Sequence, residues 1–439
     1  MFEMYGKYTN AKIMIDEIDQ STASQIQEMI NHPAATNPVA IMPDTHAGKG
    51  CVIGFTMKTS DKIVPNWIGV DVGCGMISIK TNLKEISENI LKSLDERIRH
   101  IIPMGMSVNN NCHKYIKSMF ISLIKNESIN CPFLNIKQFQ NINEKKLSDI
   151  LDAIGMSKER FWNSLGTLGG GNHFIEIGKD EEGLIWITVH TGSRNFGKTV
   201  CEYFDKKAQS TLNKNDTIIY AQTLRDKAKR GEIEFSEIEK LVKKRKQETK
   251  YDFNIKTSAF LSGDDVNEYL SFMFLAQIYA QFNRKLIIDQ ILDSLSIIID
   301  GKISIDEKIE SIHNFIDFED NTIRKGAIRS YLNEKIILPF NMRDGLLICE
   351  GKSNPEWNYS APHGAGRVLS RRGAKDNISI EEYKKSMEGI FTTSVGMDTI
   401  DESPMAYKEA KIIENAIEPT AKILHRVKPI YNVKAGENK

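Results

Sequence analysis

The chain has 439 residues, of which 41% are hydrophobic and 26% charged, a composition typical of a globular protein with one to three domains. Lys plus Arg and Asp plus Glu both number 58, so net charge indicates no nucleic-acid partner and any basic surface must be local. The apolar runs are too short to span a membrane, the first residues lack a signal segment, and the six cysteines form no CxxC pair, so we expect a cytoplasmic enzyme or binding protein with reduced thiols and no membrane contact.

The first eighty residues are predicted to be rich in strands. Short apolar runs occupy residues 39–44, 51–57 and 75–80, separated by Gly, Asp and Pro, as in buried strands joined by tight loops. Helical spacing follows at 83–100 and 113–125, and further strands are expected at 173–178 and 184–190.

The stretch 202–290 is long, rich in charged residues and poor in Gly and Pro, which predicts helices. The part at 225–250 is predicted to be an exposed helix and the part at 266–292 a largely buried one. We interpret the stretch as a helical insertion, not a separate enzyme. The chain then returns to glycine-rich loops and ends with a predicted helix near 406–424.

Polar side chains gather in loops where predicted strands end, and loops on a rigid scaffold often carry function. The motifs are "MPDTHAGKG" with Asp44, "GVDVGCGM" with Asp71 and Cys74, "TLGGGNHFIEI" with Asn172, His173 and Glu176, "VHTGSR" with His190 and Arg194, and "APHGAGRVLSRR" with His363, Arg367 and Arg371.

Two of these loops indicate a metal site. Glycines on both sides of Cys74 let the backbone turn and direct the sulfur into a cavity, where Asp71 can converge; a buried structural cysteine is the alternative. His173 and His190 complete a mixed O, S and N donor set typical of transition metals, and His313 is a further candidate. The softness of these donors favours zinc, and the residues alone predict one or two divalent metals.

The "PHGAGR" loop suits a phosphate instead. Its glycines free the backbone amides, and Arg367 and Arg371, four residues apart, would share a helix face and bind phosphate oxygens in bidentate fashion. His363 at its mouth is a turn residue, a phosphate donor or a nucleophile, because neutral imidazole is available at pH 7.

Together these motifs resemble the RtcB family of RNA-splicing ligases. "PDTHAGKG", "GVDVGCGM", "LGTLGGGNHFIEI", "VHTGSRNFG", "IRKGA", "APHGAGRVLSR" and "DESPMAYK" occur in order, from about residue 40 to the "NVKAG" near the end. The resemblance implies one large α/β (α+β) domain over 1–439, with central β-sheets, flanking helices and the insertion at 202–290. It also implies an RNA ligase that uses GTP and two manganese ions to join a 3′-phosphate or 2′,3′-cyclic phosphate end to a 5′-hydroxyl end, in tRNA splicing or RNA repair.

The resemblance also implies residue roles. Asp71, Cys74 and His173 would hold one manganese ion, and Cys74 would bridge to a second ion held by His190 and His313. His363 would become guanylylated, with Asp44 orienting it. The implied nucleotide ligands are Glu176 at the guanine edge, Tyr407 beside the base, Lys434 reaching it, and Asn172, Arg194, Arg367 and Arg371 at the phosphates, with Arg160 a weaker candidate. An archease-like activator is a further implied partner.

One segment departs from the family. Residues 338–345 read "LPFNMRDG" where commoner members carry a Gly-Ser-Met-Gly turn, so Arg343 and Asp344 put nucleotide contacts there in doubt and suggest a branch specialised for repair. The rival hypotheses are a metal-dependent cyclic phosphodiesterase or phosphatase, which would not need His363, and a non-catalytic RNA-binding protein. For the basic "LVKKRKQ" at 241–247, a solvated helix face is favoured over an RNA contact.

Overall fold

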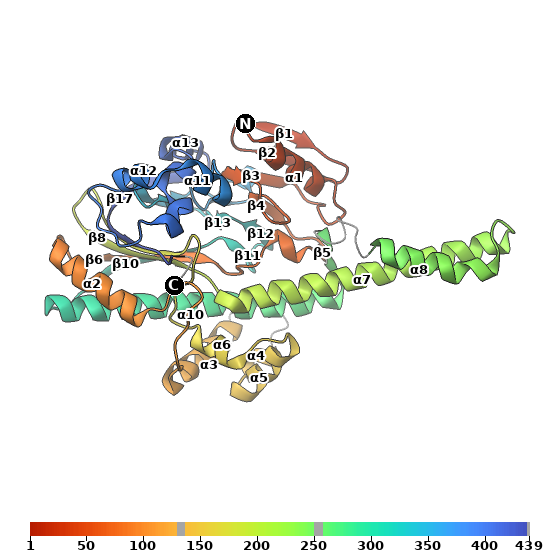
Figure 1. The fold of residues 1–439 in the computed structure, drawn as a ribbon, viewed down its shortest axis with the longest axis horizontal. Coiled ribbons are helices and arrows are strands. Elements are labelled where there is room, and N and C mark those ends of the chain that lie inside the picture. Colours follow the sequence, from red (N-terminus) through yellow and green to blue (C-terminus); the bar gives the residue numbers. More distant parts are fainter. Residues whose placement is uncertain (130–136, 250–257, 437–439) are drawn as a thin grey trace.

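The computed structural model describes residues 1–129, 137–249 and 258–436, which form a mixed α/β body with a long helical arm projecting from one side (Figure 1). The α/β class expected from the sequence is therefore confirmed. Among the described helices, none has both the length and the apolar character needed to cross a bilayer.

The first main sheet has six strands in the order β1-β2-β3-β4-β12-β11. They are β1 (Phe2–Tyr5), β2 (Asn10–Ile13), β3 (Val39–His46), β4 (Ile53–Lys58), β12 (Thr322–Lys325) and β11 (Asn314–Ile316). Strands β2 and β3 are parallel and joined through helix α1 (Gln20–Ile30), whereas the other pairs are antiparallel. Strands β3 and β4 are those predicted at 39–44 and 51–57.

The second main sheet has seven strands in the order β10-β6-β8-β7-β17-β15-β14. They are β10 (Ile305–Ile312), β6 (Gly75–Thr81), β8 (Ile185–Thr191), β7 (Phe174–Lys179), β17 (Ala421–Val433), β15 (Gly345–Gly351) and β14 (Lys335–Asn341). Two short pairs join β13 (Ala327–Arg329) to β16 (Ser360–Pro362) and β5 (Lys62–Ile63) to β9 (Leu261–Ser262). The strands expected at 75–80, 173–178 and 184–190 are thus confirmed as β6, β7 and β8.

Helices α2 (Glu88–Ile101) and α10 (Asp264–Ile299) cover one face of the second sheet. Ile77 and Ile177 of the sheet are buried in one apolar cluster with Leu94 of α2 and Ile287 and Ile291 of α10. A second cluster, which contains Met76 and Trp186, covers the other face. Burial on both faces explains why β6 and β8 are rich in apolar residues and why even their polar Ser78 and Thr188 are buried.

The remaining helices lie at the periphery. Below α10 in Figure 1 lie α3 (Lys114–Ile129), α4 (Lys137–Gln140), α5 (Glu144–Ala153) and α6 (Lys158–Asn163). On the opposite side lie α11 (Arg371–Asn377), α12 (Ile380–Ser386) and α13 (Ala410–Ala416). Short 3-10 turns occupy Pro65–Trp67, Phe235–Glu237, Pro355–Trp357, Met397–Glu402 and Pro404–Ala406. The helices predicted at 83–100 and 113–125 are confirmed as α2 and α3.

The arm consists of the outer part of α7 (Arg194–Lys229) and α8 (Ile238–Thr249). The prediction of one exposed helix over 225–250 is wrong, because the chain reverses between the two helices. Gly231 follows the end of α7 and adopts a φ of 75°, a left-handed conformation that suits glycine. It therefore ends the helix and lets the chain turn back. The helix predicted at 266–292 lies within α10, which extends further at both ends.

The helix predicted near 406–424 is also corrected. Only Ala410–Ala416 is helical there, and β17 begins at Ala421. Pro419 explains the early end, because proline cannot donate the next helical hydrogen bond and disfavours helix at the residue before it. Strand pairing with β15 and β7 then determines the conformation that follows.

Candidate functional site

The antiparallel register of the second sheet brings four distant segments to one edge. Gly75 at the start of β6 lies opposite Thr191 at the end of β8, and Phe174 at the start of β7 lies opposite His190. On the other side of β6, Ile312 at the end of β10 also pairs with Gly75. Residues at and just outside these strand ends therefore converge, although the outermost of them, Asp71 and His313, are 242 positions apart in the sequence.

The converging side chains are Asp71, Cys74, His173, His190 and His313. Oδ2 of Asp71 lies 2.9 Å from Nε2 of His173, which is 3.4 Å from Sγ of Cys74. The same sulfur is 3.3 Å from Nε2 of His190, and that nitrogen is 3.3 Å from Nε2 of His313. The structure thus brings all five predicted metal ligands into one chain of close contacts.

This donor set fits a metal ion. Ligand atoms of Cys74, His173 and His190 lie within 4.8 Å of one another, and all three residues are buried. Burial, reinforced by the neighbouring His173, holds the pKa of His190 well below its ordinary value, so its ring offers a neutral nitrogen. Buried donors that face one another without water are poorly satisfied by themselves, and a cation would satisfy them together. The cluster can therefore hold metal.

Arg284 of α10 bonds to the backbone next to the metal-ligand candidates. Its side chain is fully buried in α10, where Nε donates to Glu310 at 2.7 Å and Nη1 donates to the carbonyl oxygens of Gly73 and Thr191 at 2.9 and 3.0 Å. Burial, reinforced by Asp71, raises the pKa of Cys74 well above its ordinary value, and the Arg284 charge opposes that rise. The guanidinium therefore favours the thiolate that a metal requires.

The glycine run beside His173 is required by close packing. Gly169 has a φ of 90°, and a Cβ there would lie 2.1 Å from Nη1 of Arg194 and 2.6 Å from Nδ1 of His173. Arg194 also donates from Nη2 to the carbonyl of Gly105 at 2.8 Å. The run thus lets a guanidinium and a candidate metal ligand lie against the backbone. Arg194 is consequently beside the metal cluster, outside the residues that line the neighbouring cavity.

His363 follows strand β16 and lies next to the metal cluster. Its ring centroid is 4.7 Å from that of His313, and its Nδ1 is 2.7 Å from Oδ2 of Asp44 at the buried end of β3. Gly366 allows this approach, because a Cβ at that position would lie 2.2 Å from the carbonyl oxygen of Asp44. The loop geometry therefore couples the two predicted catalytic residues.

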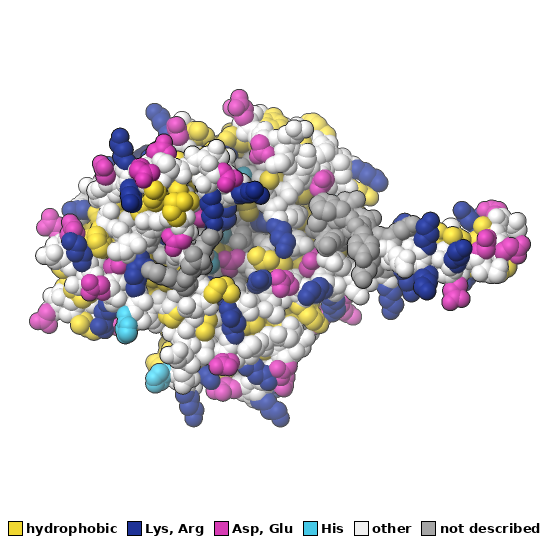
Figure 2. Space-filling view, viewed as in Figure 1, with side chains coloured by type: hydrophobic (Ala, Val, Ile, Leu, Met, Phe, Trp, Pro, Cys, Tyr) yellow, Lys and Arg dark blue, Asp and Glu magenta, His cyan; other side chains and the backbone are white. Residues whose placement is uncertain are grey.

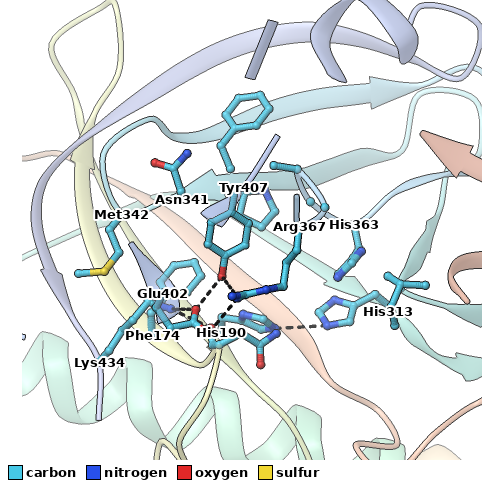
Figure 3. A pocket seen from close by; sticks show the side chains of 18 of the residues that line it. Phe174, His190, His313, Asn341, Met342, His363, Arg367, Glu402, Tyr407 and Lys434 are labelled. Carbon is cyan, nitrogen blue, oxygen red and sulfur yellow. Dashed lines mark hydrogen bonds and ion pairs between the residues drawn. The ribbon is translucent and has the colours of Figure 1, made fainter. Parts of the chain in front are cut away.

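A cavity of about 280 Å³ opens beside His363. Its lining includes the predicted residues Asn172, Glu176, His190, His313, His363, Arg367, Arg371, Tyr407 and Lys434. Figure 3 shows His363 and His313 at one end, with Lys434 and Glu402 at the other. The cavity therefore joins the metal cluster to a polar pocket, and its size suits a small molecule of nucleotide dimensions.

Glu402 organises the polar end. Its oxygens lie 2.9 Å from Nζ of Lys434, 2.7 Å from Nη1 of Arg371 and 3.5 Å from Nη1 of Arg367, and they accept a hydrogen bond from the Tyr407 hydroxyl at 2.7 Å (Figure 3). Burial opposes ionisation, but the three cations dominate and lower the pKa of Glu402 to about 2. The carboxylate is thus ionised and fixes the side chains that line the pocket.

Glu176 is a second buried carboxyl with the opposite character. Burial raises its pKa to about 8, although a hydrogen bond from Asn432 at 2.9 Å and the charge of Lys434 oppose the shift. Its Oε1 has no hydrogen-bond partner among the described residues and faces a cavity that it lines. An unpartnered buried oxygen of this kind is suited to accept a hydrogen bond from a ligand.

In the segment 338–345, which departs from the family pattern, the polar groups of Asn341, Arg343 and Asp344 bond to one another. Asn341 accepts hydrogen bonds from the backbone N–H groups of Arg343 and Asp344 at 3.0 and 2.9 Å, and the two charged side chains pair with each other at 2.7 Å. Phe340, Asn341, Met342 and Gly345 still line the cavity. The charges therefore face each other while the turn keeps its place at the cavity wall.

Sequence reasoning did not select Glu402, Asn432 or Arg284. Glu402 stands in the quoted motif "DESPMAYK", where its acidic neighbour Asp401 gave no reason to prefer it. Arg284 lies in the stretch predicted to be a largely buried helix, which is a usable signal, since a buried arginine needs partners. Arg160, the weaker phosphate candidate, lies within α6 and outside the cavity lining.

Comparison with known proteins gives a consistent result. The profile of the family described as "tRNA-splicing ligase RtcB" matches residues 25–435. The chain is 29% identical over 432 residues to the RNA-splicing ligase RtcB of Escherichia coli (strain K12), with 93% of each chain covered. It is 26% identical to the tRNA-splicing ligase RtcB of Pyrobaculum aerophilum, covering 90% of this chain and 87% of that one, and 26% identical to that of Nanoarchaeum equitans, covering 97% and 94%.

Proposed function

Because the chain belongs to the tRNA-splicing ligase RtcB family, we propose that it is an RNA ligase. Its substrates are an RNA end with a 3′-phosphate or 2′,3′-cyclic phosphate and an RNA end with a 5′-hydroxyl, in tRNA splicing or RNA repair. The observation that carries the proposal is the position of His363, with Nδ1 held 2.7 Å from Asp44 and its ring 4.7 Å from that of His313. The proposed nucleophile thus lies beside the candidate metal cluster and lines a cavity of nucleotide size.

Two manganese ions are the proposed metals. Asp71, Cys74 and His173 would hold the first, and Cys74, His190 and His313 the second, in keeping with the order of their contacts. The metals supply charge stabilisation to phosphate oxygens during transfer. Donor softness alone favours zinc, but metal selection in cells also depends on availability, so the family preference takes precedence over softness.

GTP is the proposed co-substrate, bound with its base at the polar end of the cavity. The unpartnered Oε1 of Glu176 would accept hydrogen bonds from the N–H groups of the guanine edge. Lys434, whose Nζ lies 2.9 Å from Glu402, would donate to the base oxygen, and Tyr407 would pack on the ring. Asn172, Arg367 and Arg371 would bind the phosphates, with Arg194 placed toward the RNA phosphate beside the metals.

The chemistry consists of three displacements at phosphorus. Nε2 of His363 attacks the α-phosphorus of GTP and pyrophosphate leaves, giving a phosphoramide bond to GMP. The RNA 3′-phosphate then attacks that phosphorus, and the GMP passes from His363 to the RNA end. Finally the 5′-hydroxyl attacks the activated 3′-phosphate and GMP leaves. Asp44 holds the Nδ1 proton throughout, which keeps Nε2 available as the nucleophile.

Labelling with GTP tests the proposal against its rivals. The protein is incubated with α-labelled GTP and manganese and then resolved on a denaturing gel. Acid-labile label on the wild type that is absent from His363→Ala is the expected result. Hydrolysis of a cyclic-phosphate RNA without label on the protein would instead identify a phosphodiesterase, and RNA binding with neither reaction would identify a binding protein. The need for an archease-like activator stays a prediction, tested by adding such a protein to the same assay.

A further inference from the structure

The helical arm separates its charges along its length. Residues 240–246 of α8 contain five Lys or Arg and no Asp or Glu, whereas the turn at 231–239 contains four Glu and no Lys or Arg. The chain as a whole has equal numbers of the two signs. Figure 2 shows basic side chains between the body and the tip, whereas acidic side chains gather at the tip beside basic partners such as Arg230, which pairs with Glu232. The arm is therefore a local basic surface on a neutral protein.

The arm is held straight by contacts that leave the basic face outward. Arg245 turns inward and pairs with Asp216 of α7 through two hydrogen bonds of 3.0 Å each, and it lies 5.7 Å from the ring of Tyr220. Lys240 and Lys243 are exposed, and within the described part of the chain no carboxylate pairs with either. Three residues apart on a helix, they share a face. Two exposed cations on a braced helix, with no partner among the residues that the structure describes, are available to an external anion.

The arm is connected to the candidate site by a single helix. α7 begins at Arg194, beside the metal cluster, and its 36 residues extend for about 54 Å at 1.5 Å per residue. The first part packs on the body, where Phe204 lies 5.2 Å from Tyr269 of α10 (ring centroids), and the rest leaves the body (Figure 1). The basic stretch of α8 runs back along this outer part. Its end nearer the body, at Lys246, therefore lies roughly 30 Å from Arg194 along the helix axis.

We propose that the basic stretch Lys240–Lys246 of the arm binds the phosphate backbone of the RNA substrate at a distance from the ends being joined. The proposal rests on the proposed RNA substrate. About ten nucleotides of a stacked strand would bridge the gap, since successive phosphates of one strand lie ~3.4 Å apart along the axis. Contacts of this kind carry no sequence information and add affinity only for RNA long enough to reach them.

Binding measurements with two RNA lengths test this inference. The probes are fluorescent 3′-phosphate RNA strands of ~5 and ~25 nucleotides, titrated with protein at several salt concentrations. The double variant Lys240→Gln, Lys243→Gln is compared with Lys84→Gln, Lys302→Gln, which removes two exposed lysines outside the arm, one before α2 and one after α10. Arg245 is left intact because it braces the arm, and circular dichroism checks that both variants fold.

The arm variant is expected to weaken binding of the long strand and to reduce the slope of log affinity against log salt by about 1.4, at ~0.7 per phosphate contact in a single strand. Binding of the short strand and labelling of His363 by GTP should not change. Equal affinity and slope for the two double variants with the long strand would overturn the inference. The basic stretch would then be assigned to binding an acidic protein partner. Labelling by GTP is measured separately. Failure of the ligase proposal would therefore remove the label, whereas failure of this inference would leave the label and change only the RNA-binding result.

Discussion

Oδ2 of Asp44 accepts a hydrogen bond from the backbone N–H of His363 at 3.2 Å and lies 2.7 Å from Nδ1 of the same residue. A carboxylate can only accept, so Nδ1 carries the proton and Nε2 is left with its lone pair. Asp44 is fully buried at the end of β3, and its side chain cannot move without disturbing the sheet. One residue thus determines both the tautomer and the orientation of the proposed nucleophile.

Asp44→Asn is therefore expected to slow guanylylation by roughly 10²- to 10⁴-fold, the range associated with a positioned proton-transfer group. The amide can donate to Nδ1 and so favour the wrong tautomer. The rate of label transfer from α-labelled GTP measures the effect, while nucleotide affinity should change little. His113→Ala, at an exposed histidine, is the control. A normal transfer rate in Asp44→Asn would show that His363 needs no partner.

Cys74→Ala should cost the protein both proposed metal sites, because its sulfur contacts both His173 and His190. His313→Ala should spare the ion on the Asp71 side, since His313 contacts the cluster through His190. Manganese bound per chain after equilibrium dialysis measures this difference directly. Equal losses in the two variants would argue against a bridging sulfur.

Glu402→Gln is expected to lower the free energy of unfolding by about 3–5 kcal/mol, because it leaves buried Lys434 without its counter-charge. The pH dependence has a definite sign. The folded pKa is lowered to about 2, so the stabilisation is complete above the ordinary pKa near 4.5 and is lost as pH falls from there toward 2.

Urea unfolding of the wild type and Glu402→Gln at neutral and acid pH measures both effects. The difference between the two proteins should shrink in acid. Glu409→Gln, at an exposed glutamate seven residues along, serves as the control and should stay within about 0.5 kcal/mol of the wild type. A difference that is independent of pH would mean that Glu402 acts by packing alone.

Glu176 is expected to make the proposed GTP binding depend on pH. Burial raises its pKa to about 8, so the free protein holds a proton there at neutral pH, whereas hydrogen bonds from guanine N–H groups require the carboxylate. GTP affinity should therefore rise with pH up to about 8 and then level off, with up to one proton released on binding below that pH. Calorimetry in buffers of different ionisation enthalpy counts the proton. Glu176→Gln should bind weakly and without proton release.

The sequence by itself indicated strands β3, β4, β6, β7 and β8 and supplied the candidate residues of the site. Cys74 between two glycines, and His173 after the run that contains Gly169, are local patterns whose chemistry can be recognised without a fold. The mainly apolar sequences of β6 and β8 likewise indicated buried strands, because apolar residues avoid water wherever they stand in the chain. The resemblance to a known family then supplied roles that spacing could not.

Only the tertiary structure decided which of these groups meet and what neutralises them. Opposition of Gly75 to both Thr191 and Ile312 is a matter of strand register, which depends on pairing between segments far apart in sequence. For the same reason the sequence does not show that Glu402, and not Asp401, organises the pocket. Only the cations that surround Glu402 in the folded chain distinguish it. The predicted helix at 406–424 was wrong where β17 pairs with its neighbours, because long-range strand pairing outweighs local helical preference.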